Sequence, residues 1–134
     1  MNRQEEISQI SRGLRLMAAE LKIPILVLTQ LNRLSTKGQM IKGKRVRQEP
    51  TMSEARESGA IEQDANIFLL LHDPDTDELK SEDLRRLSKN LSDNGMKLIY
   101  VNVDKNRQGK KGVFYIAFDG DHMRFLPLSK ENPP

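Results

Sequence analysis

The 134-residue sequence has no cysteine, no apolar run long enough to cross a bilayer, and no apolar signal-peptide core near its N-terminus. Without cysteine the chain can form neither disulfides nor thiolate metal sites, and it has no cysteine nucleophile. Its length is enough for one domain that buries roughly two-thirds of its unfolded surface. These features predict a soluble, cytoplasmic, single-domain protein with no membrane partner.

Positive charge is small in total but clustered along the sequence. The net charge is only +3, yet six cations lie between residues 33 and 47, ahead of any acid in that loop, and four more lie between residues 105 and 111. Clustered cations of this kind indicate a polyanionic partner. The members are Arg33, Lys37, Lys42, Lys44, Arg45 and Arg47, followed by Lys105, Arg107, Lys110 and Lys111.

Four consecutive aliphatic residues, from Ile25 to Leu28, stand between Pro24 and Thr29. A short apolar run without alternation is typical of a strand that is covered on both faces, as in a parallel sheet. Ligands of open parallel sheets collect beyond the carboxyl ends of the strands. We therefore expect Gln30 and the basic loop after it to lie at a ligand-binding edge.

The remaining pattern predicts an α/β fold with a mostly parallel sheet, flanking helices and a C-terminal antiparallel hairpin. The expected elements are a helix over 5–22, strands over 25–29, 66–71 and 96–103, and hairpin strands over 113–118 and 123–126. The predicted domain covers residues 1–128, and residues 129–134 form a loose tail.

Three segments between these elements are less regular. Residues 32–50 read as a long basic loop without structure of its own, which is typical of a functional or disordered segment. A short helix over 53–57 is interrupted at Ser58-Gly59 and resumes over 61–65. The leucines between residues 79 and 91 predict a weakly amphipathic helix, which we expect to be peripheral because its apolar stripe is narrow.

Two patterns resemble ligand sites but lack a residue that the chemistry requires. The run from Gly38 to Arg45 has P-loop spacing, but Arg45 stands where the hydroxyl that binds Mg²⁺ is needed. Asp73, Asp75 and Asp77 begin like a calcium loop, without its glycine and its bidentate glutamate. No metal site is predicted from either pattern.

Four segments in a fixed order are more specific than the general α/β pattern. They are Leu28–Arg33, Met52–Asn66, Lys105–Gly109 and the hairpin Phe114–Phe125. Their order resembles the C-terminal part of the RecA-like motor domain of DnaB-type replicative DNA helicases, and the resemblance extends over residues 7–128. In that family the P-loop and the magnesium-binding aspartate strand precede the helix that contains Ile7, so the resemblance implies a partial RecA-like fold without the P-loop half.

The resemblance implies roles for three residues near ATP. In such helicases ATP lies between subunits, and the neighbour of the P-loop subunit contributes a Lys-x-Arg pair, which Lys105 and Arg107 match. Arg107 would be the arginine finger, because a guanidinium can answer the charge that spreads over the γ-phosphoryl oxygens. Gln30 would sense the γ-phosphate. From the residues alone, simpler alternatives stay open. Residues 105–111 could be only a solvated basic turn, and Gln30 could be a glutamine at a strand end that bonds to the backbone.

The resemblance also implies a loop that binds single-stranded DNA. Arg56 would pair with a phosphate, Gly59 would allow close approach of the DNA backbone, and Glu57 would orient a neighbouring group. The basic residues Arg33, Lys42, Lys44 and Arg45 would add to the same surface. Few aromatic residues lie nearby, since Phe68 is expected in the core, so contact with the DNA backbone is favoured over base stacking.

The implied function is that of a fragment of an ATP-dependent 5′-to-3′ DNA helicase, inactive alone and working in a homo-oligomeric, hexameric ring. ATP and Mg²⁺ would be held mainly by a neighbouring subunit. The alternative is a non-catalytic DNA-binding or helicase-capping module that retains the fold. A RecA-like recombinase is a third reading, which the run from Ser58 to Asp64 disfavours.

Overall fold

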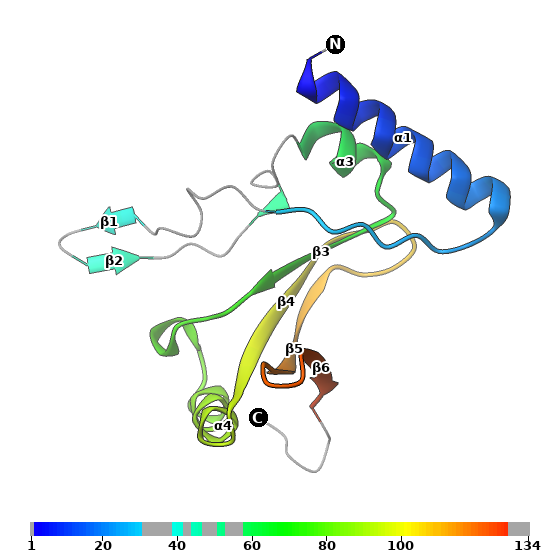
Figure 1. Ribbon diagram of the computed structural model, residues 1–134. Helices are drawn as coiled ribbons and strands as arrows, with labels where there is room; N and C mark the ends of the chain where they lie inside the picture. Colours follow the sequence, from blue (N-terminus) through cyan, green and yellow to red (C-terminus); the bar gives the residue numbers. More distant parts are fainter. Residues whose placement is uncertain (1, 31–38, 42–43, 47–50, 53–57, 129–134) are drawn as a thin grey trace. The chain divides into compact units, whose positions relative to one another are not determined.

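The computed structural model describes residues 2–30, 39–41, 44–46, 51–52 and 58–128 (Figure 1). Contacts divide the chain into two compact units. Unit 1 comprises Met1–Phe68 and Asp104–Gly109, and unit 2 comprises Leu69–Val103 and Lys110–Pro134. The predicted helix over 53–57 lies outside the described residues, and so does the predicted tail.

In the described part of unit 1, the helices α1 (Arg3–Leu21) and α3 (Ser58–Asp64) pack against each other (Figure 1). Helix α1 confirms the first predicted helix. Its start is fixed by a capping box, in which the Asn2 side chain accepts a hydrogen bond from the Glu5 amide and the Glu5 side chain accepts one from the Asn2 amide. It ends at Lys22, which has a left-handed backbone. Among the described residues no helix has the length and apolarity needed to span a membrane.

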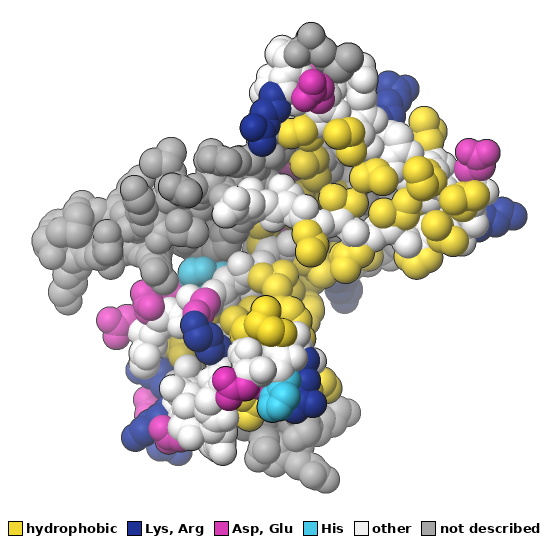
Figure 2. Space-filling model, viewed as in Figure 1, with side chains coloured by type: hydrophobic (Ala, Val, Ile, Leu, Met, Phe, Trp, Pro, Cys, Tyr) yellow, Lys and Arg dark blue, Asp and Glu magenta, His cyan; other side chains and the backbone are white. Residues whose placement is uncertain are grey.

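The segment from Ile25 to Thr29 is not a strand, so this prediction was wrong. It is extended but unpaired, and the side chains of Leu26 and Leu28 are 86% and 89% exposed. A strand needs a neighbour that supplies hydrogen bonds and a layer that covers its side chains, and neither is specified by the aliphatic run itself. Figure 2 shows the resulting apolar surface over α1 and this segment.

Part of the basic loop between residues 32 and 50 has regular structure, contrary to the prediction. Strands β1 (Gln39–Ile41) and β2 (Lys44–Val46) pair antiparallel, with Met40 opposite Arg45. Met40, Ile41 and Val46 are the β-compatible residues of this loop, so the local sequence supports a hairpin. The remainder of the loop lies outside the described residues.

A four-stranded sheet is formed by β3 (Ile67–His72), β4 (Met96–Asn106), β5 (Gly112–Asp119) and β6 (Arg124–Pro127), in that order. The pairs β4–β5 and β5–β6 are antiparallel, which confirms the predicted hairpin. Two contacts give the direction of β4 relative to β3. The Arg107 amide, just after β4, bonds the Asn66 carbonyl, just before β3, and the ring of Tyr100, earlier in β4, contacts the ring of His72 at the end of β3. The residue numbers therefore run in opposite directions, and every pairing in the described sheet is antiparallel rather than parallel.

The core of unit 2 is built around three buried leucines, Leu79, Leu87 and Leu98. Leu87 comes from α4 (Glu82–Asp93), which is capped by the Ser81 side chain, and Leu79 follows the short 3₁₀ helix η2 (Thr76–Glu78). The predicted peripheral position of this segment was wrong. Its apolar stripe is narrow, but Leu79 adds to it from outside the helix, and together they cover the sheet at Leu98.

Strand β3 confirms the second predicted strand but is buried on one face only. Phe68 and Leu70 are 7% and 3% exposed, whereas Leu69 and Leu71 on the other face remain accessible. The alternation is that of a strand with a single covered face. Phe68 is a core residue, as the sequence predicts.

Replacing Leu79 with alanine should destabilise the chain by about 2–5 kcal/mol, because the side chain is only 1% exposed and a cavity would remain. Urea unfolding followed by circular dichroism measures the loss. Leu69→Ala, in the same unit but 43% exposed, is the control and should cost less than about 1 kcal/mol. Equal losses in the two variants would show that α4 and the turn before it do not form the core.

Candidate functional site

Lys105 and Arg107 extend from the end of β4 onto the last turn of α3 in unit 1. The Lys105 ammonium donates to the carbonyl of Glu62 and, at 3.4 Å, to that of Gln63. The Arg107 guanidinium donates to the same Gln63 carbonyl at 2.5 Å. Carbonyls in the last turn of a helix lack intrahelical partners and carry the negative end of the helix dipole. The two cations therefore provide hydrogen-bond donors to carbonyls at the end of α3, and these shared carbonyls hold the two side chains next to each other.

A third cation reaches the same turn from α1. The Arg15 guanidinium lies 3.6 Å from the carboxylate of Asp64, the last residue of α3. The pKa of Lys105 lies below its ordinary value because burial disfavours the charged ammonium, and because the neighbouring charges of Arg107 and Arg15 repel it. The carboxylates of Glu62 and Asp64 act in the opposite direction and are outweighed.

The residue that precedes this pair also makes a long-range contact. The Asp104 carboxylate accepts a hydrogen bond of 2.9 Å from the amide of Met52, and this bond is partly buried. Met52 stands just before residues 53–57, and α3 begins just after them. Residues 104–107 are thus bonded to the chain on both sides of the segment that contains Arg56 and Glu57.

The structure brings together only some of the residues that the sequence singles out. Lys105 is partly buried and Arg107 is exposed, and the side chains of both donate to carbonyls of α3. Gln30 is exposed in the extended segment after α1, and no described hydrogen bond joins it to the pair. The predicted DNA-contacting residues Arg33, Lys42, Arg56 and Glu57 lie outside the described residues, and for Lys44 and Arg45 only the backbone is described.

Gly59, the remaining predicted DNA contact, is exposed in the first turn of α3. A methyl group added at its Cα would meet no atom of the described residues within 4 Å, so the space that they leave beside it is open. Gly59 also lines a pocket between α3 and the first turns of α1. Its other lining residues are Asn2, Gln4, Glu5, Ser8, Gln9 and Ala60.

Sequence reasoning missed Arg15, Asp64 and Asp104 as members of this region. Asp104 and its partner Met52 are 52 positions apart, and no local spacing connects them. The acceptors of Lys105 and Arg107 are main-chain carbonyls, which every residue has. Helical spacing could at most have placed Arg15 outside the apolar stripe of α1.

The acidic turn and the two histidines of unit 2 make internal polar contacts. His72 contacts Glu78 at 2.7 Å, and Asp73 contacts Lys97 at 2.8 Å. Hydrogen bonding to the Asp73 carboxylate, more than its charge, raises the pKa of Lys97. Within the described ranges, no group of three histidine or acidic side chains could hold a metal ion.

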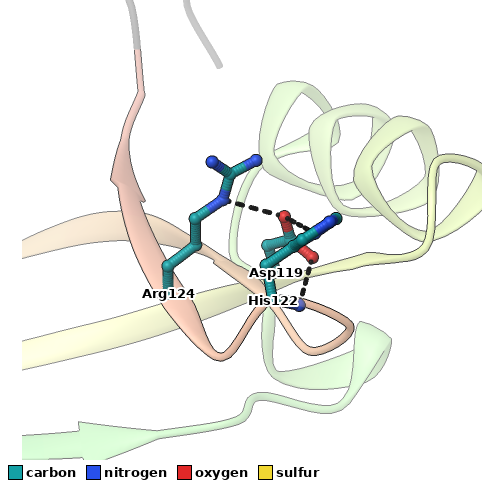
Figure 3. A network of polar contacts seen from close by, with 3 residues as sticks. All are labelled: Asp119, His122 and Arg124. Atoms are coloured by element: carbon teal, nitrogen blue, oxygen red, sulfur yellow. Dashed lines mark hydrogen bonds and ion pairs between the residues drawn. The ribbon is translucent and has the colours of Figure 1, made fainter.

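The turn between β5 and β6 is held by Asp119, which is 8% exposed (Figure 3). Its carboxylate accepts hydrogen bonds from the His122 amide at 3.3 Å, the His122 ring at 2.9 Å and the Arg124 guanidinium at 3.0 Å. Burial alone would raise the pKa of Asp119, but the bonds from Arg124 and His122 outweigh it and lower the pKa. The ionised form of the Asp119 side chain thus stabilises the turn of the predicted hairpin.

Solved structures with the same fold define the class of protein. A DnaB-like replicative helicase, described with its interactions with primase, matches 96% of this chain with a TM-score of 0.69 and 30% identity, over 27% of its own chain. A second solved structure, of an ATPase domain, matches 96% of this chain with a TM-score of 0.69 and 35% identity, over 39% of its own. The chain therefore has part of the RecA-like fold of a helicase ATPase domain, which confirms the predicted partial RecA-like fold.

Sequence comparison gives the family. The profile of the DnaB-like helicase C-terminal domain matches residues 1–127, so the chain belongs to that family. It is 37% identical over 129 residues to the replicative DNA helicase DnaB of Geobacillus stearothermophilus, and 36% identical over 131 residues to the replicative DNA helicase DnaC of Bacillus subtilis. Both alignments cover 96% of this chain and 24% of the relative, so the chain spans about a quarter of their length.

Replacing Asp119 with asparagine should lower stability near neutral pH and flatten its loss in acid. Because the pKa of Asp119 is lowered by folding, its contribution is fully present above the pKa of the unfolded chain and is lost as pH falls through the folded value. Urea unfolding at a series of pH values should show the two proteins converging below about pH 4. Asp121→Asn removes a carboxylate from the same turn as a control. Matching acid profiles for all three proteins would contradict this account.

Proposed function

We propose that this chain acts as the part of a replicative DNA helicase motor that completes the ATP site of a neighbouring subunit and contacts single-stranded DNA. The observation that supports this most is the convergence of Lys105 and Arg107 on α3, the helix that begins at the expected DNA loop. The proposed phosphate-binding pair and the proposed DNA-binding segment are then both attached to α3. The motor as a whole would unwind DNA in the 5′-to-3′ direction as a hexameric ring.

Arg107 is the proposed arginine finger. Its side chain is exposed, and its bond to the Gln63 carbonyl engages one NH₂ group of the guanidinium, so other N–H donors remain for a phosphate. A guanidinium supplied to a neighbour's nucleotide stabilises the charge on the γ-phosphoryl oxygens and is worth about 10³ to 10⁵ in rate. Lys105 is partly buried and would fix the end of β4 while adding positive charge.

Gln30 is the proposed sensor of the γ-phosphate. Its amide can donate to a phosphate oxygen or accept from water without adding charge. The residue is exposed at the end of the extended segment, where a ligand can reach it.

The proposed DNA surface combines Arg56, Glu57 and Gly59 with the basic residues Arg33, Lys42, Lys44 and Arg45. The open space at Gly59 and the pocket beside it suit a sugar-phosphate backbone that accepts hydrogen bonds from exposed amides. The hydrogen bond from Met52 to Asp104 would fix the position of this surface relative to Arg107.

ATP and Mg²⁺ would be the cofactors of the complete motor, and the residues present here fit the phosphates rather than the metal. Ammonium and guanidinium groups have no free electron pair for a metal ion, and the nearby Asp64 carboxylate is paired with Arg15. The metal, when bound, would polarise the phosphoryl group from the P-loop side. The groups of this chain would orient the γ-phosphate and stabilise its charge.

The second candidate is a module that caps a helicase ring without taking part in hydrolysis. The exposed apolar side chains of Leu26 and Leu28 favour it, because surfaces of this kind mark contacts with other proteins.

The finger is tested by adding this chain to an intact DnaB-type helicase whose own finger arginine has been replaced. The wild-type chain should raise the ATPase rate about tenfold, since mixed rings recover only part of the ~10³ to 10⁵ effect of a finger. Arg107→Ala should give no increase, and Lys111→Ala is the matched control. Stimulation by Arg107→Ala would refute the finger, and inhibition by wild type and Arg107→Ala alike would support the capping module.

Binding of single-stranded DNA should weaken as salt rises, with a log–log slope of about −0.7 for each neutralised phosphate. Fluorescence anisotropy with a labelled oligothymidine measures the slope. Arg56→Ala should reduce its magnitude by about 0.7, and Gly59→Val should weaken binding by closing the open space at that position. Lys89→Ala, on α4, is the control. A salt-independent affinity would remove the proposed DNA surface.

A further inference from the structure

Arg15 brings a third positive charge to the turn of α3 that holds Lys105 and Arg107. Its ion pair with Asp64 measures 3.6 Å, which is too long for a hydrogen bond, and its side chain is 48% exposed. The donors of the Arg15 guanidinium are therefore available to a ligand from solvent. Asp64 directly follows Gln63, whose carbonyl accepts from both other cations.

Among the described residues, the charges at this turn are not balanced. Arg15, Lys105 and Arg107 face two carboxylates, Glu62 and Asp64, and the neighbouring charges of Arg107 and Arg15 help to lower the pKa of Lys105. Cations held close together by a rigid frame attract a multiply charged anion, which relieves their repulsion. The frame here consists of α1, α3 and the end of β4.

We propose that Arg15 forms a three-cation site with Lys105 and Arg107 that binds the polyphosphate of a nucleotide. This inference rests on the proposed function, in which Lys105 and Arg107 face a nucleotide, and adds Arg15 as a further phosphate-binding residue. A planar guanidinium can bridge two phosphate oxygens, so a second arginine at this turn suits a triphosphate chain better than a single phosphate.

The competing account is that the cations only cap the C-terminus of α3. Lys105 and Arg107 fit that account, since both donate to its last carbonyls. Arg15 does not fit it as well, because its contact is with the Asp64 side chain and not with a carbonyl. A capping role predicts that loss of Arg15 changes stability alone.

The test is titration of the full chain with sodium tripolyphosphate, followed by NMR through the side-chain Nε–H resonance of Arg107. Arg15→Gln should weaken the affinity read at this resonance about tenfold, a typical effect of losing a charge-assisted hydrogen bond. Arg15→Lys, which keeps the charge, should lose less than about threefold. Arg12→Gln, one turn earlier on α1, is the matched control and should leave the affinity unchanged.

A second readout is the pH titration of Lys105 without the probe. Arg15→Gln should raise the pKa of Lys105 toward its ordinary value, because one of the repelling charges is gone. An Arg15→Gln affinity equal to that of Arg12→Gln overturns the inference, whether or not thermal stability falls. Absence of any shift at Arg107 in the wild-type chain overturns it as well. The proposed finger is judged separately, by the mixing assay, in which the neighbouring subunit supplies the nucleotide.

Discussion

The hydrogen bonds from Lys105 and Arg107 to the last carbonyls of α3 are the constraint on which the rest of unit 1 depends. Helix α3 has seven residues, too few to be stable by itself, so it requires packing against α1 and partners for its free carbonyls. Both partners come from the end of β4. The same residues that the resemblance assigns to phosphate chemistry therefore also hold a structural element in place.

Lys105 and Arg107 are both cations of the same sequence motif, but their positions in the structure give them different roles. Lys105 is partly buried, and its bonds to two carbonyls engage most of its ammonium donors. Arg107 is exposed and keeps free donors after bonding Gln63. The geometry thus favours Lys105 as the group that fixes the end of the strand, and Arg107 as the group that reaches outward. Asp104 extends the arrangement by holding Met52, on the far side of the expected DNA loop.

Local patterns in the sequence predicted α1 and the β5–β6 hairpin, because capping, periodicity and turn residues act within a few positions. The prediction for Ile25–Thr29 was wrong because burial of a strand depends on neighbours that the segment does not encode. The position of α4 was misjudged for a related reason, since Leu79, outside the helix, completes its apolar surface. In the candidate site, the resemblance supplied Lys105 and Arg107. Their carbonyl partners and Arg15 depend on long-range packing, which no motif in this chain records.

The proposed nucleotide-facing residues also differ in how they are positioned. A side chain acts on a phosphate only when a rigid element holds it near its productive place. Arg107 meets this condition, since it directly follows β4, its amide bonds the Asn66 carbonyl, and its side chain bonds the Gln63 carbonyl of α3. Gln30 follows an unpaired segment whose leucines face solvent, so its position is not set by a sheet. Pairing of residues 25–29 with another strand would bury these leucines and fix Gln30 in one step, so the proposed sensing of the γ-phosphate would be coupled to completion of the sheet.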